Sequence, residues 1–285
     1  MEYMSNSLFT RILLLPLLLL SGGFVSCSPG PEEKAVIKLA AQGIFEGSYQ
    51  RELHQAATRG DMDMIKLLVH AGTNVNYCDE QGLSVLHTAI LSGHASEARF
   101  LMKAGARANT LSAAGDSPLI DAFNHQGQKL IMPLIEAGAD VAQLSPHNQE
   151  SILWLAAQQN LEELVRELIN VEGLPLNQVN RAGLSPLFVA IRNNNEAIMG
   201  MLLAAGADVS LGDATGFTPL MHAIKEQNTN LALRLIQAGA ALDATDNTGQ
   251  TALALALAKA NKRVARTLVQ AGARTEGYDL SLLND

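Results

Sequence analysis

Residues 82–94, with the sequence GLSVLHTAILSGH, bring together side chains that could perform nucleophilic chemistry. Ser84 follows a Gly-Leu pair, and two histidines, His87 and His94, come soon after it. A serine activated by a histidine base is the arrangement with which many hydrolases attack a carbonyl carbon. A serine can instead start a helix, because its hydroxyl accepts a hydrogen bond from a backbone N–H in the first turn. This stretch alone is therefore compatible with a hydrolase and with a purely structural element.

An internal repeat of 33 or 34 residues includes this stretch. Three sets of residues recur in the same register over seven copies. Agreement of this kind is typical of a repeat protein, in which each unit buries its apolar face only against its neighbours. The sets are the leucines Leu53, Leu86, Leu119, Leu153, Leu187, Leu220 and Leu253, the glycines Gly72, Gly105, Gly138, Gly173, Gly206, Gly239 and Gly272, and the apolar residues Leu68, Leu101, Leu134, Ile169, Leu202, Leu235 and Leu268.

Each copy predicts two helices and a turn. A hydroxyl residue starts the first helix, which is short and carries leucine and alanine on its buried side. Gly60, Gly93, Asn160 and Asn194 follow this helix, where a left-handed residue is useful. A second helix with apolar residues at i, i+3 and i+4 ends near the repeated glycine. The hydroxyl residues are Ser84, Ser117, Ser185, Thr218 and Thr251, and turns of the type Asp/Asn-x-x-Gly begin at Asp79, Asn180, Asp213 and Asp246.

The repeated pattern resembles the ankyrin repeat. The stretches DATGFTPLMHAI (213–224) and LAAGADVSLGD (203–213) match the motif of that family almost residue for residue. The resemblance covers residues 49–275 and implies an all-α fold, a solenoid of about seven helix-turn-helix repeats with β-turn fingers that project from one edge. It also implies that His87 bonds to the backbone and braces neighbouring loops.

The repeat favours the structural interpretation of Ser84. A nucleophile is needed once, whereas several copies have serine or threonine at this position. The stretch also lacks the second glycine and the preceding strand of a G-x-S-x-G nucleophile elbow. The histidines have no metal-ligand spacing, and no glycine-rich loop suits a phosphate. We therefore predict no catalytic residues, no metal and no cofactor; a hydrolase remains a remote alternative.

The middle of the array departs from the pattern. Pro133 lies inside a second helix and should kink or shorten it. The next copy has SPHNQES (145–151) without the turn glycine, and Trp154 stands where the family has histidine. Sequence drift in loops that tolerate substitution and a contact with a specific partner are both compatible with these changes. Before the first copy, residues 32–47 predict a short additional helix.

The N-terminus predicts export from the cytoplasm. Residues 12–20 form an apolar run after Arg11 that is too short to span a bilayer, which is typical of a signal peptide. The four residues ending at Cys27 resemble the lipobox of bacterial lipoproteins, which implies lipidation of Cys27. The predicted organisation is a signal peptide over 1–26, a lipidated N-terminus and linker over 27–48, and the repeat domain over 49–285. The resemblance implies an anchor in the outer rather than the inner membrane, facing the periplasm.

Cys78, the one remaining cysteine, has no partner for an internal disulfide.

The charge and the aromatic content of the chain exclude some partners. The net charge is −8, with four tyrosines and one tryptophan. Nucleic-acid binding needs basic tracks and stacking platforms, so it is not expected. The expected partner is another protein, bound by a chain that is monomeric beforehand.

The family binds proteins through its finger tips and the exposed side of its first helices. Carried over position by position, the candidate protein-binding residues are Glu80, Gln81, Leu83, Leu91, Asp116, Asn124, His125, Glu150, Gln158, Arg181, Leu184, Arg192, Thr215, Phe217 and Lys225. Leu83, Leu184 and Phe217 share one finger position; each either anchors a partner or packs on the adjacent finger. The predicted function is a membrane-tethered periplasmic module that binds, and in a sharper version neutralises, a toxin or phospholipase effector. The alternative is an accessory factor for a periplasmic enzyme such as catalase.

Overall fold

The structure is a computed structural model that describes residues 30–44 and 46–283. The chain forms two compact units, Met1–Ala139 and Asp140–Asp285, and each is described by itself. The predicted signal peptide (1–26) and the predicted lipidation site Cys27 lie outside the described residues. Within the described part every regular element is a helix, apart from two isolated β-bridges. The predicted all-α fold of repeated helix pairs is therefore confirmed.

The first unit contains three helix pairs and one helix before them. We call the first helix of each pair the inner helix and the second the outer helix. The inner helices are α3 (Tyr49–Arg59), α5 (Val85–Leu91) and α7 (Pro118–Asn124), and the outer helices are α4 (Met62–His70), α6 (Ala95–Lys103) and α8 (Ile131–Glu136). The 3₁₀ turns η1 (Glu46–Ser48) and η2 (Gln128–Leu130) precede α3 and α8, and α2 (Pro31–Ala41) packs against α4. The additional N-terminal helix predicted over 32–47 is confirmed with shorter bounds.

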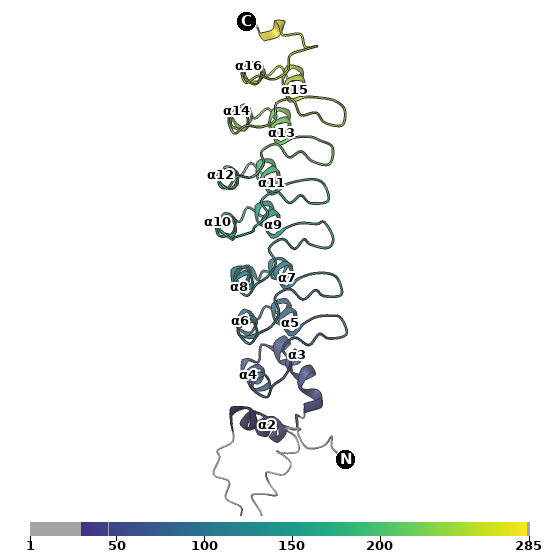
Figure 1. Ribbon diagram of the computed structural model, residues 1–285, viewed down its shortest axis with the longest axis vertical. Helices are drawn as coiled ribbons and strands as arrows, with labels where there is room; N and C mark the ends of the chain where they lie inside the picture. The colour runs from purple at the N-terminus through teal and green to yellow at the C-terminus, as the bar shows by residue number, and fades with distance from the viewer. Residues whose placement is uncertain (1–29, 45, 284–285) are drawn as a thin grey trace, which may run out of the picture. The chain divides into compact units, whose positions relative to one another are not determined.

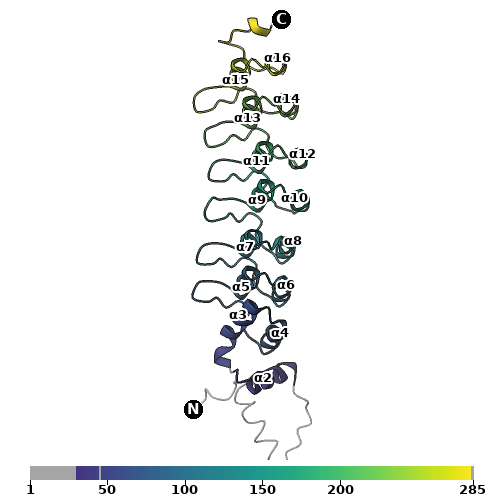
Figure 2. The ribbon, with the colours of Figure 1, turned by 180° about the vertical axis from the view of Figure 1, so that it is seen from behind.

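The second unit contains four helix pairs. Its inner helices are α9 (Ile152–Gln158), α11 (Pro186–Arg192), α13 (Pro219–Lys225) and α15 (Ala252–Ala258). Its outer helices are α10 (Glu162–Leu168), α12 (Glu196–Ala204), α14 (Thr229–Gln237) and α16 (Lys262–Gln270), followed by the 3₁₀ turn η3 (Ser281–Leu283). Within each unit, inner helix follows inner helix and outer follows outer, and the fingers project to one side (Figures 1 and 2).

Capping side chains fix where the helices begin. The hydroxyls of Ser84, Ser117, Ser185, Thr218 and Thr251 each accept a hydrogen bond from the backbone N–H three residues later, at 3.1–3.4 Å. Side-chain oxygens of Asp61, Asn195, Asn228 and Asn261 do the same for outer helices. Each cap pairs one of the N–H groups that a helix start leaves without a partner.

The core of each unit lies between neighbouring helix pairs. The inner-helix leucines Leu53, Leu86 and Leu119 in the first unit are at most 1% exposed, as are Leu153, Leu187, Leu220 and Leu253 in the second. The outer-helix residues Leu68, Leu101, Leu134, Leu202, Leu235 and Leu268 are fully buried. The prediction is wrong for Ile169, which is only half-buried; the buried residue is Leu168. One of the two extra residues of this repeat lies between Leu168 and Gly173, after α10 has ended, so the position four residues before the glycine falls on Ile169. Leu168 itself follows Leu153 by 15 residues, as Leu134 follows Leu119.

Pro133 shortens its helix, as predicted. It is the third residue of α8, which has 6 residues, whereas α4 and α6 each have 9. At this place the missing N–H costs no hydrogen bond, because N–H groups in the first turn have no intrahelical partner. The three residues before α8 form the 3₁₀ turn η2 instead.

Each inner helix ends at a residue in the left-handed conformation. Gly60 and Gly93 have φ angles of +69° and +78°, and Asn160 and Asn194 have +56° and +55°, which confirms the prediction at these four positions. Ala260 occupies the same place in the last repeat with a φ of +53°. A Cβ atom is unfavourable in this conformation, and alanine has no side-chain polar group to offset the cost.

Replacing Ala260 with glycine should therefore stabilise the protein. We expect the free energy of unfolding to rise by about 0.5–1 kcal/mol, since removal of the left-handed strain exceeds the entropy that glycine adds to the unfolded chain. Urea denaturation followed by circular dichroism measures the change. In the control Ala258→Gly, at the last helical residue of α15, stability should fall by about 0.5 kcal/mol. A loss of stability in Ala260→Gly would contradict the explanation.

Candidate functional site

The fingers are turns held by one side-chain oxygen. The Oδ1 atoms of Asp79, Asn180, Asp213 and Asp246 each accept hydrogen bonds from the backbone N–H groups two and four residues later, at 2.8–3.0 Å. This side chain closes the turn in the manner of an Asx turn. We refer to residues 79–83, 112–116, 145–150, 180–184, 213–217 and 246–250 as the fingers.

The turn glycine is required because the next finger approaches closely. Gly82 and Gly216 have φ angles of +72° and +79°. A Cβ atom on Gly82 would lie 2.9 Å from the backbone nitrogen of Ala113 in the following finger, and one on Gly216 would lie 2.9 Å from the carbonyl oxygen of Thr245, directly before the following finger. In the finger 145–150, Gln149 takes the left-handed place with a φ of +58°. The position therefore selects glycine both for its conformation and for its lack of a side chain.

Within each unit, one backbone hydrogen bond joins each finger to the next. In the first unit, the N–H of Ala113 donates to the carbonyl of Gln81 at 3.1 Å. In the second unit the equivalent bonds run from Arg181 to Asn148, from Ala214 to Ala182 and from Asn247 to Thr215, at 2.8–2.9 Å. The donor in each of these bonds is the residue after the first residue of its finger. We call this contact the finger bond.

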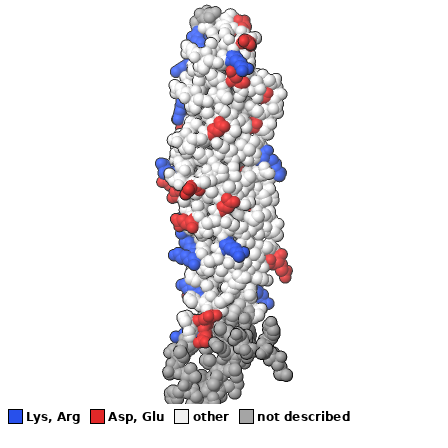
Figure 3. All heavy atoms as spheres, viewed as in Figure 1, with Lys and Arg blue, Asp and Glu red and all other residues white. Residues whose placement is uncertain are grey.

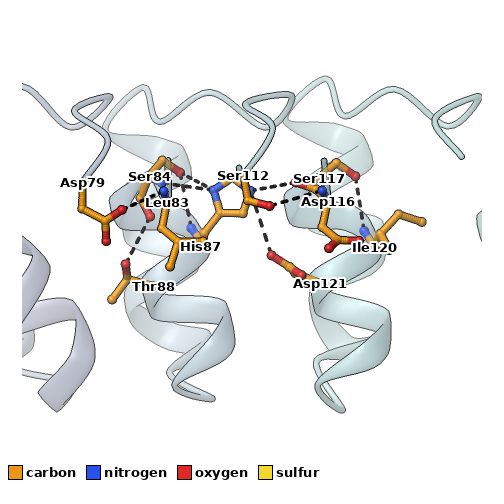
Figure 4. A network of polar contacts seen from close by, with 10 residues as sticks. All are labelled: Asp79, Leu83, Ser84, His87, Thr88, Ser112, Asp116, Ser117, Ile120 and Asp121. Carbon is orange, nitrogen blue, oxygen red and sulfur yellow. Dashed lines mark hydrogen bonds and ion pairs between the residues drawn. The ribbon is translucent and has the colours of Figure 1, made fainter. Parts of the chain in front are cut away.

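Ser84 and His87 form a closed structural network (Figure 4). The backbone N–H of Ser84 donates to Nδ1 of His87 at 3.2 Å, and the Ser84 hydroxyl lies 2.8 Å from the same nitrogen. Because Nδ1 accepts, the ring proton is on Nε2, which donates to the carbonyl of Asp116 in the next finger at 3.3 Å. The predicted bracing role of His87 is confirmed.

The same network contains a serine, a histidine and a carboxylate, yet substrate cannot reach it. Oδ2 of Asp121 lies 4.0 Å from Nε2 of His87, so the three groups follow the order of a catalytic triad. Ser84 is only 2% exposed and His87 is fully buried. A nucleophilic oxygen must contact its substrate, so this arrangement supports a helix start and not hydrolysis. Burial also lowers the pKa of His87, which keeps its ring neutral.

Asp121 is a buried carboxyl that favours its protonated form. Burial raises its pKa from 3.8 to about 6, and the nearby Asp116 carboxylate adds to the shift, while His125 opposes it. At the equivalent position of the preceding repeat stands Thr88, whose hydroxyl lies 3.1 Å from His54. Position 121 therefore faces the histidine of the previous repeat, as position 88 does.

The exposed residues of the predicted surface lie where the repeat places them, on finger tips and inner-helix ends. In the first unit these are Glu80, Gln81, Asn124 and His125, with Leu83, Leu91 and Asp116 partly exposed. In the second unit they are Arg181, Arg192, Thr215 and Lys225, with Glu150, Gln158 and Phe217 partly exposed. Their role in partner binding stays a prediction.

The expectation that Leu184 is available to a partner is wrong. Its exposure is 9%, so it belongs to the core of the second unit. Its backbone carbonyl accepts from Asn180 within its own finger. Phe217, at the same finger position in the next repeat, is partly exposed, and the Lys225 ammonium lies 5.5 Å from the centre of its ring.

One surface group was not found from the sequence. Tyr77 is 44% exposed, and its ring meets that of His54 edge to face, with 6.0 Å between the ring centres. No repeated signal marks Tyr77. Asn193, which the repeat register places next to Arg192 on the predicted surface, donates to the carbonyl of Gln158 at 3.1 Å and links two inner helices of the second unit.

The described residues contain no group of three or more His, Cys, Asp and Glu side chains that could hold a metal ion. In the same part of the chain, none of the helices has the length and apolar composition of a bilayer-spanning segment. On the face drawn in Figure 3, charges of both signs occur on a surface that is mostly uncharged.

Stacked helix pairs with finger turns define the class of ankyrin-repeat proteins, which are typically interaction scaffolds and not enzymes. The model of the family "Ankyrin repeats (3 copies)" matches residues 53–145, 127–213 and 201–279. The chain belongs to the ankyrin repeat family. Proteins of this family bind other proteins.

Individual relatives agree with this assignment. The chain is 30% identical over 153 residues to the putative ankyrin repeat protein YahD of Escherichia coli, a match that covers 52% of the chain and 76% of YahD. An ankyrin repeat domain from Acinetobacter baumannii superposes with a TM-score of 0.61 and 32% identity, over 66% of the chain and 98% of that domain. The L-asparaginase of Dirofilaria immitis is 28% identical over 59% of the chain, but the match spans only 27% of that enzyme.

Replacing Asp121 should change how stability depends on pH. The folded pKa lies above the unfolded one, so the carboxyl stabilises the fold below pH 3.8, and this contribution is lost as the pH rises through about 6. Asp121→Asn and Asp121→Thr should therefore raise the free energy of unfolding at pH 7.5, by up to about 3 kcal/mol. Threonine is the residue at the equivalent position of the preceding repeat.

Urea denaturation at pH 7.5 and at pH 4 checks this expectation. The gain should largely disappear at pH 4, where the wild-type carboxyl is protonated in the folded state. An equal gain at both pH values would show that the carboxyl charge is not its cause.

Proposed function

We propose that the exposed inner-helix ends and fingers of the second unit form the surface that binds a partner protein. The observation that carries this proposal is the partly exposed Phe217, which lies beside Lys225 on the finger side of α13. Aromatic side chains, phenylalanine among them, are enriched in the buried centre of protein interfaces. Arg192 adds a second cation one inner helix earlier, and its guanidinium donates to Gln158 at 3.1 Å.

His222 adds to the same surface. The centre of its ring lies 5.8 Å from that of Phe188. Burial lowers its pKa, Glu226 opposes the shift, and Lys225 and Arg192 add to it. A neutral imidazole can both donate and accept hydrogen bonds. The surface therefore combines an aromatic ring, two cations and a neutral hydrogen-bonding group, which suits a mixed polar and apolar protein surface.

In its sharper form, the proposal places this module at a bacterial membrane, where it neutralises a toxin or phospholipase effector. The support is in the N-terminal sequence: a short apolar run, a signal-peptide pattern and Cys27 at a lipobox-like site. A binding surface tethered at the membrane would meet an effector where it enters the periplasm.

Phe217→Glu should weaken partner capture. Glutamate removes the apolar anchor and introduces a charge, so we expect the recovered partner to fall at least tenfold, a loss of about 1.4 kcal/mol or more. The measurement is affinity capture from a bacterial envelope extract, with each captured protein quantified by mass spectrometry. The control Leu203→Glu places the same change on the outer helix α12 and should leave capture intact.

The outcomes separate the alternatives. Loss of an effector from the captured set supports neutralisation, whereas loss of an enzyme such as catalase supports an accessory role. Capture that is unchanged in Phe217→Glu would contradict the proposed surface, provided that circular dichroism shows unchanged helix content.

Cys27→Ser should abolish lipid attachment. The wild-type chain expressed in bacteria should incorporate labelled palmitate and sediment with membranes, because acyl chains hold a protein at a bilayer. The variant should incorporate no label and appear in the soluble periplasmic fraction. Membrane association that persists in Cys27→Ser would contradict the tether.

A further inference from the structure

The finger series of the first unit begins with an unused hydrogen-bond donor. By its position in the finger 79–83, Glu80 is equivalent to the donors Ala113, Arg181, Ala214 and Asn247. Each of those residues donates its N–H to the carbonyl of the finger before it. Among the described residues, the N–H of Glu80 has no partner. The side of this finger that would face a preceding finger is therefore an open edge.

The edge is open because the first repeat has helix where later repeats have a finger. Residues 46–59 form η1 and α3. Arg51, within α3, stands at the repeat position that Ser84 takes in the next copy. Helical residues therefore stand at the repeat position where a finger before 79–83 would be.

A cavity of about 350 Å³ lies at this edge. This volume is within the range of ligand-binding clefts. The cavity is lined by Arg51, His54, Tyr77, Asp79, Glu80 and Gln81.

The lining offers few free donors, and they differ in kind. Both ring nitrogens of His54 are engaged, one with Thr88 and one with the carbonyl of Tyr77. Oδ1 of Asp79 closes its own turn. The Arg51 guanidinium makes no hydrogen bond or ion pair to the described residues, and the Tyr77 ring is 44% exposed. An occupant therefore meets a backbone N–H, a guanidinium and an aromatic ring, beside the exposed side chains of Glu80 and Gln81.

We propose that this edge binds a turn segment of another polypeptide, which takes the place of the absent finger. A backbone carbonyl of the segment accepts from the N–H of Glu80, as the carbonyl of Gln81 accepts from Ala113 at 3.1 Å. A carboxylate of the segment pairs with Arg51, and an apolar side chain covers Tyr77. Addition of a segment to an open edge is a recurring mode of peptide recognition.

The finger 145–150 has no hydrogen-bond donor at the position equivalent to Glu80. Pro146 follows its first residue, and a proline has no N–H to donate. Proline at an edge is a common means of preventing added segments. The chain therefore tolerates proline after the first residue of a finger, which supplies the variant for a test.

The test uses the ¹⁵N-labelled full chain and a synthetic peptide of residues 207–218, ADVSLGDATGFT. In the protein this segment contains a finger whose Thr215 carbonyl accepts the bond from Asn247. Titration should shift the NMR signal of the Glu80 amide and slow its hydrogen exchange. The Ala113 amide, which is already bonded, serves as the internal reference.

Glu80→Pro should weaken peptide binding three- to tenfold, as expected for the loss of one hydrogen bond, and Arg51→Gln by a similar factor. Glu80→Ala removes the same side chain but keeps the N–H, so it should bind like the wild type. Circular dichroism confirms that each variant is folded.

Equal binding by Glu80→Pro and Glu80→Ala would overturn the proposal, as would the absence of any peptide-induced shift at Glu80. Self-association of the chain through Glu80, detected by sedimentation without peptide, would overturn the assignment to a different polypeptide. The proposal rests on the protein-binding role of the chain. Failure of Glu80→Pro together with loss of capture in Phe217→Glu would reject this edge and leave the surface of the second unit in place.

Discussion

Each repeat depends on its neighbour to bury its apolar residues. The inner-helix leucines of both units are almost completely inaccessible, although no helix pair is large enough to enclose them alone. Helix lengths, turns and finger contacts all keep successive helix pairs in register, so that the repeated leucine of one inner helix packs next to that of the following one. The need to keep these leucines aligned explains why the repeat length stays at 33 or 34 residues and why departures from the repeat length fall in loops.

The network at Ser84 illustrates how similar residues serve different ends. Hydroxyl, imidazole and carboxylate groups lie within hydrogen-bonding or ion-pair range, as in a hydrolase. Their burial decides the outcome, because the hydroxyl caps a helix and the imidazole links two successive repeats. The corresponding position elsewhere is occupied by Trp154, whose indole N–H has no partner among the described residues. The site therefore tolerates different side chains as long as they fill the space between repeats.

Much of the fold could be predicted because it depends on local chemistry. A serine at a helix start, a glycine or asparagine at a helix end and an Asx turn in a finger each act within a few residues, so the sequence displays them directly. The prediction failed at Ile169, because one extra residue lies between the end of α10 at Leu168 and Gly173, so counting back from the glycine misses the buried leucine by one. No other copy has an extra residue at this place.

The candidate site was less predictable, because exposure depends on the neighbouring repeat. Leu184 and Phe217 share one finger position, yet the first is buried and the second reaches the surface. The unused N–H of Glu80 could not be predicted from the sequence either, since the backbone N–H at the same position donates a hydrogen bond in four other fingers. Such features arise from what lies next to a residue, and a period describes only what the repeats have in common.

The buried pair of Asp121 and His87 has a consequence for how the first unit unfolds. In the folded protein burial favours the uncharged form of both, because it raises the pKa of the acid to about 6 and lowers that of the base. In the unfolded chain at mildly acidic pH the carboxyl is ionised and the imidazole is protonated. Unfolding there favours the ionisation of both groups, and the proton that the carboxyl releases offsets the proton that the imidazole takes up. A titration that counts only net protons would therefore underestimate how much ionisation accompanies the loss of structure.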